Sequence, residues 1–223
     1  MRQKNNETAA VPRVVGIVDS QAAVRIARLL KPQKVDLLEW RADCLPSLEM
    51  PVVGLPWILT VRDPAEGGKG EFRAEARRDV LLRLLPGSDL VDIECANLRA
   101  FSDVVDRAHA AQKQVIASFH DFEKTPPAPT LSRIIRQAAD HGADIVKIAV
   151  GTHTPADVAV LLGLFDRVES PLALMGMGPL GMASRLVLAA AGSRLNYGWL
   201  HRPNVSGQWS ATELRRLVGR VTP

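Results

Sequence analysis

The stretch from residue 114 to residue 149 reads QVIASFHDFEKTPPAPTLSRIIRQAADHGADIVKIA, and it holds the pattern that decides the fold. At its ends stand two short apolar runs, Gln114–His120 and Asp144–Ala149, nearly continuous in hydrophobicity like strands buried on both faces. Between these runs, apolar residues recur at the spacing of one helix face, at Leu131, Ile134, Ile135 and Ala138. The stretch therefore predicts two parallel strands joined by a helix.

The same alternation of strand and helix continues along almost the whole chain. The predicted strands are Arg13–Val18, Val35–Arg41, Trp57–Arg62, Leu90–Glu94, Gln114–His120, Asp144–Ala149, Pro171–Met175 and Leu195–Leu200. The connection over residues 42–56 contains three prolines and no long amphipathic stripe, so we expect a reduced or irregular second helix there. The pattern predicts an α/β protein in which residues 1–223 form a single catalytic (β/α)8 barrel, the TIM-barrel fold, with an open doubly wound sheet as the alternative.

Composition and charge narrow the possible functions. Of the 223 residues, 47% are hydrophobic and 23% are charged, which is ordinary for a soluble globular protein. No apolar run reaches the roughly 18 residues of a membrane helix, and the polar N-terminus lacks the apolar core of a signal peptide. The net charge is +4 but aromatic residues make up only 4%, which favours a small anionic substrate over nucleic acid. We expect a cytoplasmic protein without a membrane partner, in which Cys44 and Cys95 are reduced thiols.

Charged and polar side chains follow or interrupt most of the predicted strands. In a parallel barrel the carboxyl ends of all strands open on one face, where active sites lie, so these side chains are expected to meet. The alternation of strand residues also places Glu39 with Arg41, and Ser118 with His120, on shared faces. The set comprises Glu39, Arg41, Arg62, Glu94, Ser118, His120, Lys147 and Arg185.

Lys147 is the candidate nucleophile, because it interrupts an otherwise apolar strand. Taken alone, such a lysine is usually a surface residue or an ion-pair partner. Inside a barrel, a neutral amine attacks a ketone or an aldehyde and forms a Schiff base. His120 then moves protons near neutral pH, and Glu94 orients its ring from the neighbouring strand.

A glycine-rich stretch offers a competing interpretation. Residues Gly176–Gly181 match G-x-G-x-x-G between a strand and a helix, but no Asp or Glu occurs between Gly181 and Glu213. A dinucleotide fold requires an acidic residue about 20 positions on, so we do not expect a nucleotide cofactor. The remaining histidines lack the spacing of metal ligands, so we expect no metal either.

Several motifs together resemble type I 3-dehydroquinate dehydratases, the Schiff-base enzymes of the shikimate pathway, which serves chorismate and aromatic amino acid biosynthesis. The resemblance extends from about Val14 to Val221. The matching segments are Glu39–Asp43, Arg62 with Glu66–Gly68, Asp92–Glu94, Ser118–Pro126, Val146–Lys147, Met175–Arg185 and Gly207–Gln208.

The resemblance implies a hydro-lyase that converts 3-dehydroquinate to 3-dehydroshikimate without metal or organic cofactor. Lys147 is expected to form the imine, His120 to act as acid and base, and Glu94 to hold the His120 ring. The implied substrate-binding residues are Glu39, Arg41 and Arg62 for the ring, Met177 for packing, Arg185 for the carboxylate, and Asn204, Ser206 and Gln208 in a closing loop. The resemblance also implies a homodimer.

Two departures from the family pattern lie in the closing loop. The family commonly reads S-x-P-G-Q, whereas this chain has Asn204 in place of the serine and Ser206 in place of the proline. They leave room for another Schiff-base lyase or aldolase acting on a related keto acid. A non-catalytic barrel that binds a shikimate-type acid is a further alternative. Many bacterial members carry an N-terminal hairpin below the barrel, but here residues 1–12 are expected to form a flexible tail instead.

Overall fold

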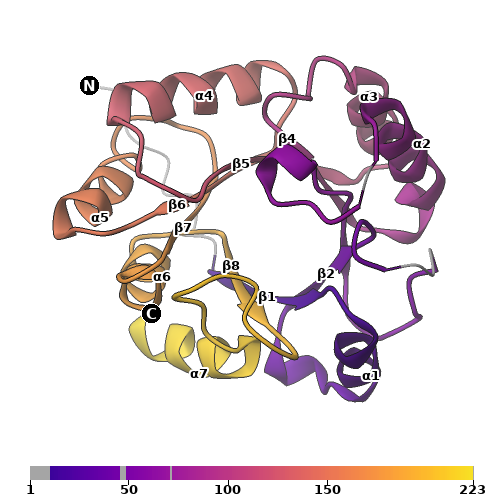
Figure 1. The fold of residues 1–223 in the computed structure, drawn as a ribbon, viewed down its shortest axis with the longest axis horizontal. Coiled ribbons are helices and arrows are strands. Elements are labelled where there is room, and N and C mark those ends of the chain that lie inside the picture. The colour runs from indigo at the N-terminus through magenta and orange to yellow at the C-terminus, as the bar shows by residue number, and fades with distance from the viewer. Residues whose placement is uncertain (1–10, 46–48, 71, 223) are drawn as a thin grey trace.

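Eight parallel strands surround a central axis, with the helices outside them (Figure 1). The computed structural model describes residues 11–45, 49–70 and 72–222. The strands pair in the order β7-β6-β5-β4-β3-β2-β1-β8, and the amide of Arg194 donates to the carbonyl of Leu172 at 2.8 Å across the remaining seam. This nearly closed arrangement confirms the predicted barrel and excludes an open doubly wound sheet. The strands are β1 Arg13–Val18, β2 Leu37–Arg41, β3 Trp57–Thr60, β4 Leu90–Glu94, β5 Gln114–Asp121, β6 Ile145–Gly151, β7 Leu172–Met177 and β8 Leu195–Trp199.

The helices occupy the connections, with one exception. In the described part of the connection between β2 and β3, no helix occurs, as the prolines there predict. The α-helices are α1 Gln21–Leu29, α2 Ala74–Leu84, α3 Ser102–Ala110, α4 Ala128–Asp140, α5 Pro155–Leu162, α6 Gly181–Ala190 and α7 Ala211–Val221. Short 3-10 turns are η1 Pro32–Lys34, η2 Pro64–Glu66 and η3 Leu85–Gly87.

Two apolar layers hold the barrel together. The larger lies between the strands and the helices, where Leu131, Ile135 and Ala138 of α4 are fully or almost fully buried. The smaller fills the barrel interior and includes the first inward-facing residues of most strands, such as Leu37 and Ile116. Burial of these side chains supplies the main driving force for folding.

In strands β2 to β6, the inward-facing row carries polar side chains after its first apolar residue. Leu37 is followed on the same face by Glu39 and Arg41, and Ile145 is followed by Lys147. The apolar residues thus fill the lower half of the barrel and leave the polar ones at its upper mouth, as in other barrels of this kind.

The expected flexible tail over residues 1–12 and the expected lack of a hairpin concern mainly residues 1–10, which lie outside the described part of the chain. No helix among the described residues has the length and apolar character needed to span a membrane.

Candidate active site

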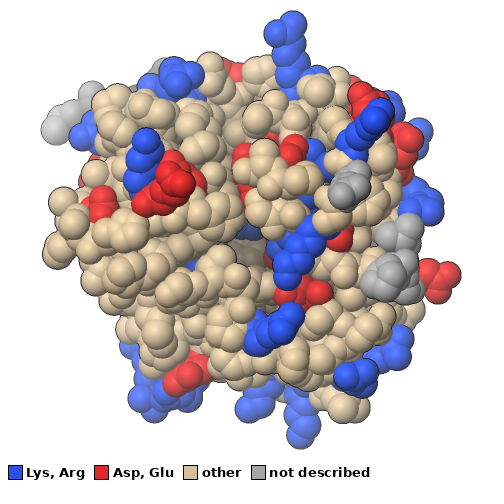
Figure 2. All heavy atoms as spheres, in the orientation of Figure 1, with Lys and Arg blue, Asp and Glu red and all other residues tan. Residues whose placement is uncertain are grey.

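A cavity of about 330 Å³ opens at the carboxyl ends of the strands. Figure 2 shows the face of the molecule hollowed near its middle. The predicted residues that line the cavity are Glu39, Arg41, Arg62, His120, Lys147, Met177, Asn204 and Gln208. Residues that were not predicted to belong to the site also line it, namely Ile17, Cys44, Glu66, Gly67, Lys69, Phe122, Ala149, Met175, Tyr197 and Val205. Glu94, Arg185 and Ser206 do not line it.

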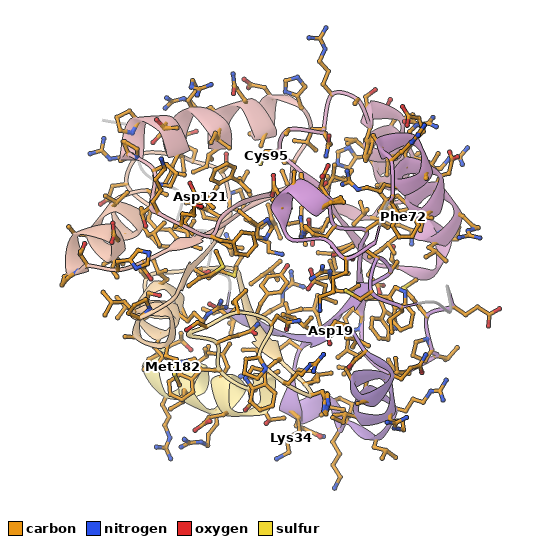
Figure 3. The ribbon with its side chains drawn as sticks, viewed as in Figure 1. Asp19, Lys34, Phe72, Cys95, Asp121 and Met182 are labelled. Carbon is orange, nitrogen blue, oxygen red and sulfur yellow. The ribbon has the colours of Figure 1, made fainter. Side chains whose placement is uncertain are left out.

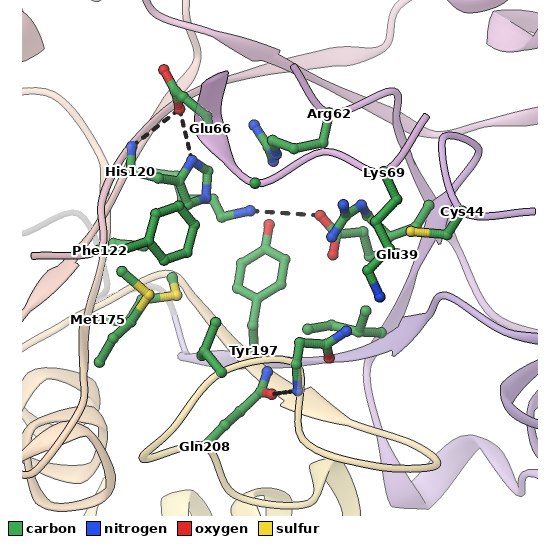
Figure 4. A pocket seen from close by; sticks show the side chains of 18 residues that line it. Glu39, Cys44, Arg62, Glu66, Lys69, His120, Phe122, Met175, Tyr197 and Gln208 are labelled. Carbon is green, nitrogen blue, oxygen red and sulfur yellow. Dashed lines mark hydrogen bonds and ion pairs between the residues drawn. The ribbon is translucent and has the colours of Figure 1, made fainter. Parts of the chain in front are cut away.

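Lys147 projects from β6 into the barrel and is 4% exposed. Its Nζ lies 3.0 Å from Asp92 Oδ2 and 3.5 Å from Glu39 Oε1. Figure 4 marks the ion pair with Glu39 as a dashed line. The same Nζ lies 4.1 Å from the centre of the Tyr197 ring, which is within the range of a cation–π interaction. The amine is therefore held at one point at the edge of the cavity.

His120 is held by Glu66 and not by Glu94, so the predicted role of Glu94 in orienting the ring is wrong for this structure. Glu66 Oε2 lies 2.8 Å from His120 Nδ1 and accepts from the His120 amide at 3.1 Å. Figure 4 shows both contacts and the His120 ring at the cavity wall. Glu66 belongs to the turn η2, which the side chain of Asp63 caps by accepting from the Ala65 amide.

The pKa values of the histidine and its partner are shifted in opposite directions. Burial, together with Arg62 and Lys147, lowers the pKa of His120 well below its ordinary value. Burial raises the pKa of Glu66 to about 8, with Arg62 opposing the rise. The imidazole is therefore neutral at pH 7 and suited to remove a proton from a bound molecule.

Glu94 is occupied elsewhere because it lies between two buried arginines. Its carboxylate pairs with Arg62 at 3.1 Å and with Arg77, which reaches in from α2. It also accepts from the Asp63 amide at 2.9 Å and from Asn97 at 3.2 Å. With these partners Glu94 stabilises Arg62 and the start of the η2 turn.

Arg62 links this carboxylate to the lysine site. Its guanidinium contacts Asp92 at 2.9 Å and the Ser118 hydroxyl at 2.5 Å. Burial acts against the charge of Asp92, but Arg62 and Lys147 hold the pKa of that carboxyl well below its ordinary value. The alternating charges fix Arg62 and Lys147 relative to each other.

Arg185 lies behind the cavity wall and lacks an acidic partner among the described residues. Its Nη1 donates to the Tyr197 carbonyl at 2.8 Å and lies 3.6 Å from Met175 Sδ, while its Nε is buried without a partner. Burial lowers the pKa of this guanidinium to about 10. A buried cation of this kind is a natural partner for an incoming carboxylate.

The closing loop between β8 and α7 lies against the glycine-rich turn after β7. The Ser206 carbonyl accepts from the Gly178 amide at 2.9 Å, and Gly207 has a φ of 74°. A Cβ at Gly207 would lie 2.2 Å from the Gly178 carbonyl oxygen, so both loops need glycine to approach this closely. The glycine-rich turn thus packs against the closing loop.

The side chains of the loop make different contacts. Gln208 accepts from the Asn204 amide at 3.0 Å. The Asn204 side chain donates to Asp19, which follows β1 (Figure 3). Through its backbone and side chain, Asn204 therefore joins the closing loop to the first strand of the barrel.

No group of three or more His, Cys, Asp or Glu side chains in residues 11–45, 49–70 and 72–222 is arranged to hold a metal ion. The polar groups at the cavity instead include an amine, an imidazole, carboxylates and guanidinium groups. Such a set can bind an anion, form an imine and move protons.

Comparisons with known proteins agree with this geometry. The model of the family described as type I 3-dehydroquinase matches residues 14–220. A 3-dehydroquinate dehydratase of Hydrogenobaculum is 33% identical over 199 residues, covering 85% of this chain and 90% of the relative. The type I enzyme of Clostridium difficile, with covalently modified comenic acid, superposes with a TM-score of 0.85 at 26% identity, covering 95% of this chain and 92% of that one. The enzyme of Aquifex aeolicus superposes with a TM-score of 0.82 at 28% identity, covering 93% and 98%.

Proposed function

Because the chain belongs to the type I 3-dehydroquinase family and catalyses the dehydration of 3-dehydroquinate, we propose that Lys147 forms an imine with the substrate ketone and that His120 transfers the protons. One observation carries this proposal. The cavity joins a buried amine, held by Asp92 and Glu39, to an imidazole that is neutral at pH 7. An imine serves as an electron sink only if a base can reach the adjacent carbon, and this pair supplies both groups.

The reaction begins with addition of the amine to the ketone carbon. Lys147 first gives up a proton, for which Glu39, at 3.5 Å from Nζ, is an acceptor. The resulting carbinolamine loses water and becomes an iminium. His120 removes a proton from the adjacent methylene, and the electron pair moves into the iminium to form an enamine. The enamine expels the hydroxyl of the carbon that bears the carboxylate, which leaves as water with the proton from His120. Hydrolysis of the remaining imine releases 3-dehydroshikimate and restores Lys147.

The other residues bind and orient the substrate. We assign the substrate carboxylate to Arg185, since that guanidinium is buried and has no acidic partner among the described residues. Glu39, Arg41 and Arg62 carry the polar groups that suit the ring hydroxyls. Met177 packs against the ring. In the closing loop, Asn204 and Gln208 cover the substrate, whereas Ser206 acts through its backbone contact to Gly178.

Glu94 is assigned to positioning. Its contacts with Arg62 and Arg77 support a role in holding Arg62 beside Asp92. The direct partner of His120 is then Glu66, whose carboxyl fixes Nδ1.

Trapping with borohydride tests the mechanism. Reduction in the presence of 3-dehydroquinate is expected to leave a stable adduct on Lys147, visible by mass spectrometry of the digested protein. Lys147→Ala abolishes both adduct and turnover, whereas Lys34→Ala, at an exposed lysine of η1, keeps both. His120→Ala slows turnover by about 10² to 10⁴-fold. Full turnover in Lys147→Ala, or an adduct on another lysine, would disprove the proposal.

We further propose a cytoplasmic homodimer. The support is the similarity to the family. Light scattering behind a sizing column is expected to give twice the mass of one chain, and cell fractionation is expected to recover the protein with cytosolic markers. A monomer at micromolar concentration would contradict the proposed dimer. Recovery in a membrane fraction would contradict the proposed cytoplasmic location.

A further inference from the structure

Tyr197 is the single tyrosine of the chain, and its side chain stands inside the active-site cavity. It follows Leu195 on the inward face of β8 and is 2% exposed. Figure 4 shows the ring near the middle of the cavity, with the hydroxyl end turned toward the ion pair that Glu39 makes. Sequence reasoning did not indicate this position, because a tyrosine in an apolar strand normally contributes to a core.

The hydroxyl of Tyr197 has no hydrogen-bond partner among the described protein groups, although its oxygen is buried. A buried hydroxyl without a partner lowers stability, because it has given up its hydrogen bonds to water. Phenylalanine would fill the same volume without that cost. Since the hydroxyl faces the cavity that binds the substrate, a substrate oxygen is the natural partner for it.

The orientation of Tyr197 indicates which oxygen that is. Its backbone carbonyl accepts from Arg185 at 2.8 Å, so this end of the residue lies beside the proposed carboxylate site. Lys147 Nζ lies 4.1 Å from the centre of the ring. The hydroxyl is the far end of the side chain, on the other side of Lys147 from Arg185. It therefore reaches beyond the carbon to which Lys147 bonds.

We propose that the Tyr197 hydroxyl donates a hydrogen bond to the substrate hydroxyl next to the ketone, on the side away from the carboxylate. The inference rests on the proposed function, which puts the ketone carbon on Lys147 and the carboxylate at Arg185. In 3-dehydroquinate the ketone carbon lies between a methylene and a carbon that bears this hydroxyl. Binding the hydroxyl therefore fixes the methylene on the opposite side, where His120 removes its proton.

Burial, together with Glu39 and Asp92, raises the pKa of the Tyr197 phenol well above its ordinary value. The phenol thus stays protonated and acts as a donor across the working pH range. The same contact distinguishes substrates, since a keto acid without this hydroxyl leaves the buried phenol unpaired.

The test combines Tyr197→Phe with a substrate analogue that carries hydrogen in place of the hydroxyl next to the ketone. Each change alone is expected to lower kcat/KM about 10-fold, as the loss of one buried hydrogen bond does. Applied together they still lower it about 10-fold, because both remove the same contact. Independent losses that multiply to about 100-fold, or an unchanged kcat/KM in Tyr197→Phe, would overturn the proposal.

Two controls separate this contact from other effects. Ser132→Ala removes another buried hydroxyl without a partner, in α4 and outside the cavity, and is expected to leave kcat/KM unchanged. Tyr197→Phe is expected to unfold at the same temperature as the wild type or a higher one, whereas a structural role for the hydroxyl predicts a lower one. Borohydride trapping on Lys147 tests the proposed function separately. If wild type and Tyr197→Phe both give the adduct but the two changes multiply, the Tyr197 proposal alone fails.

Discussion

Replacement of Arg77 by methionine is expected to destabilise the protein strongly, although this arginine lies on an outer helix. Its side chain passes inward from α2 and is 1% exposed. It donates to the Val61 carbonyl at 3.0 Å, pairs with Asp63 at 2.5 Å and with Glu94, and lies 5.5 Å from the centre of the Phe101 ring. Methionine fills part of the volume but leaves these groups without their cation.

The magnitude follows from the burial of the partner. The Glu94 side chain is 1% exposed, so it stays in the barrel wall when Arg77 is lost. Breaking a buried ion pair by removing one partner costs about 3 to 5 kcal/mol. Because Glu94 still contacts Arg62 and the Asp63 amide in the variant, we expect the loss in free energy of unfolding to lie near the lower end, about 3 kcal/mol. For a chain of this length that corresponds to a fall of about 6 to 12 °C in Tm.

Thermal unfolding followed by circular dichroism measures the effect, with Arg78→Met as the matched control. Arg78 is the next residue of α2, but its side chain is 38% exposed and pairs with the exposed Asp103. Such surface pairs contribute about 0 to 1 kcal/mol, so the control is expected to lose at most about 4 °C. The double variant Arg77→Met with Glu94→Gln is expected to lose less than the sum of the two single variants. Equal losses in the Arg77 and Arg78 variants would refute the reasoning.

Three further changes are expected to have measurable effects. Glu66 has a pKa of about 8, raised by burial above its ordinary 4.5, so the folded protein holds a proton that the unfolded chain loses in this window. As the pH rises from 4.5 to 8, the free energy of unfolding of the wild type is therefore expected to fall by up to about 1.4 kcal/mol per pH unit relative to that of Glu66→Gln. Urea unfolding measures both values, and a difference between them that does not change with pH would contradict this. Asp19→Ala releases the Asn204 side chain and is expected to raise KM severalfold with little change in Tm, whereas an unchanged KM would mean that the contact does not order the loop. Arg185→Met removes a buried, unpaired cation, so the substrate-free protein is expected to gain a few degrees in Tm while the affinity for 3-dehydroquinate is lost, and a lower Tm would show that the cation stabilises the free protein.

The fold was predictable because the barrel repeats a simple local pattern. Strand β1 and strand β4 begin and end at the predicted residues, and the helix that the prolines disfavour is missing from the described part of its connection. Helical periodicity is a weaker guide at helix ends, as Val221, the last residue of α7, is 43% exposed. Helix ends project beyond the layer that they cover, so the last residue of a stripe is the one most exposed to solvent.

The strand-end residues of the site were predictable for the same reason. Alternation along β2, β5 and β6 places Glu39, His120 and Lys147 on the inward face without knowledge of any contact. Glu66 could not be found in this way, because it lies in a short turn after β3 that has no strand or helix period. The one signal for Glu66 was the matching segment Arg62 with Glu66–Gly68 in the family resemblance. The buried position of Arg77 could not be predicted either, since helix periodicity leads us to expect a charged residue of an amphipathic helix to face solvent.

The error over Glu94 shows what strand position does not determine. A residue at the carboxyl end of a strand reaches the mouth of the barrel, but the cations that arrive from other elements decide which contacts it makes. Arg62 and Arg77 engage Glu94, and Asp92 and Glu39 engage Lys147, so these cations have carboxylate partners before any substrate enters.

Arg185 is the buried cation that lacks an acidic partner among the described residues, and the substrate carries one carboxylate. In the proposed binding mode, the substrate enters with its carboxylate toward Arg185, and its ketone then faces Lys147 past the Tyr197 ring. Imine formation keeps the positive charge at Lys147, so the pairs with Asp92 and Glu39 persist while the ketone becomes an electron sink. Under this proposal, charge balance in the substrate-free barrel determines the direction of binding, and the methylene is presented to His120 as a consequence.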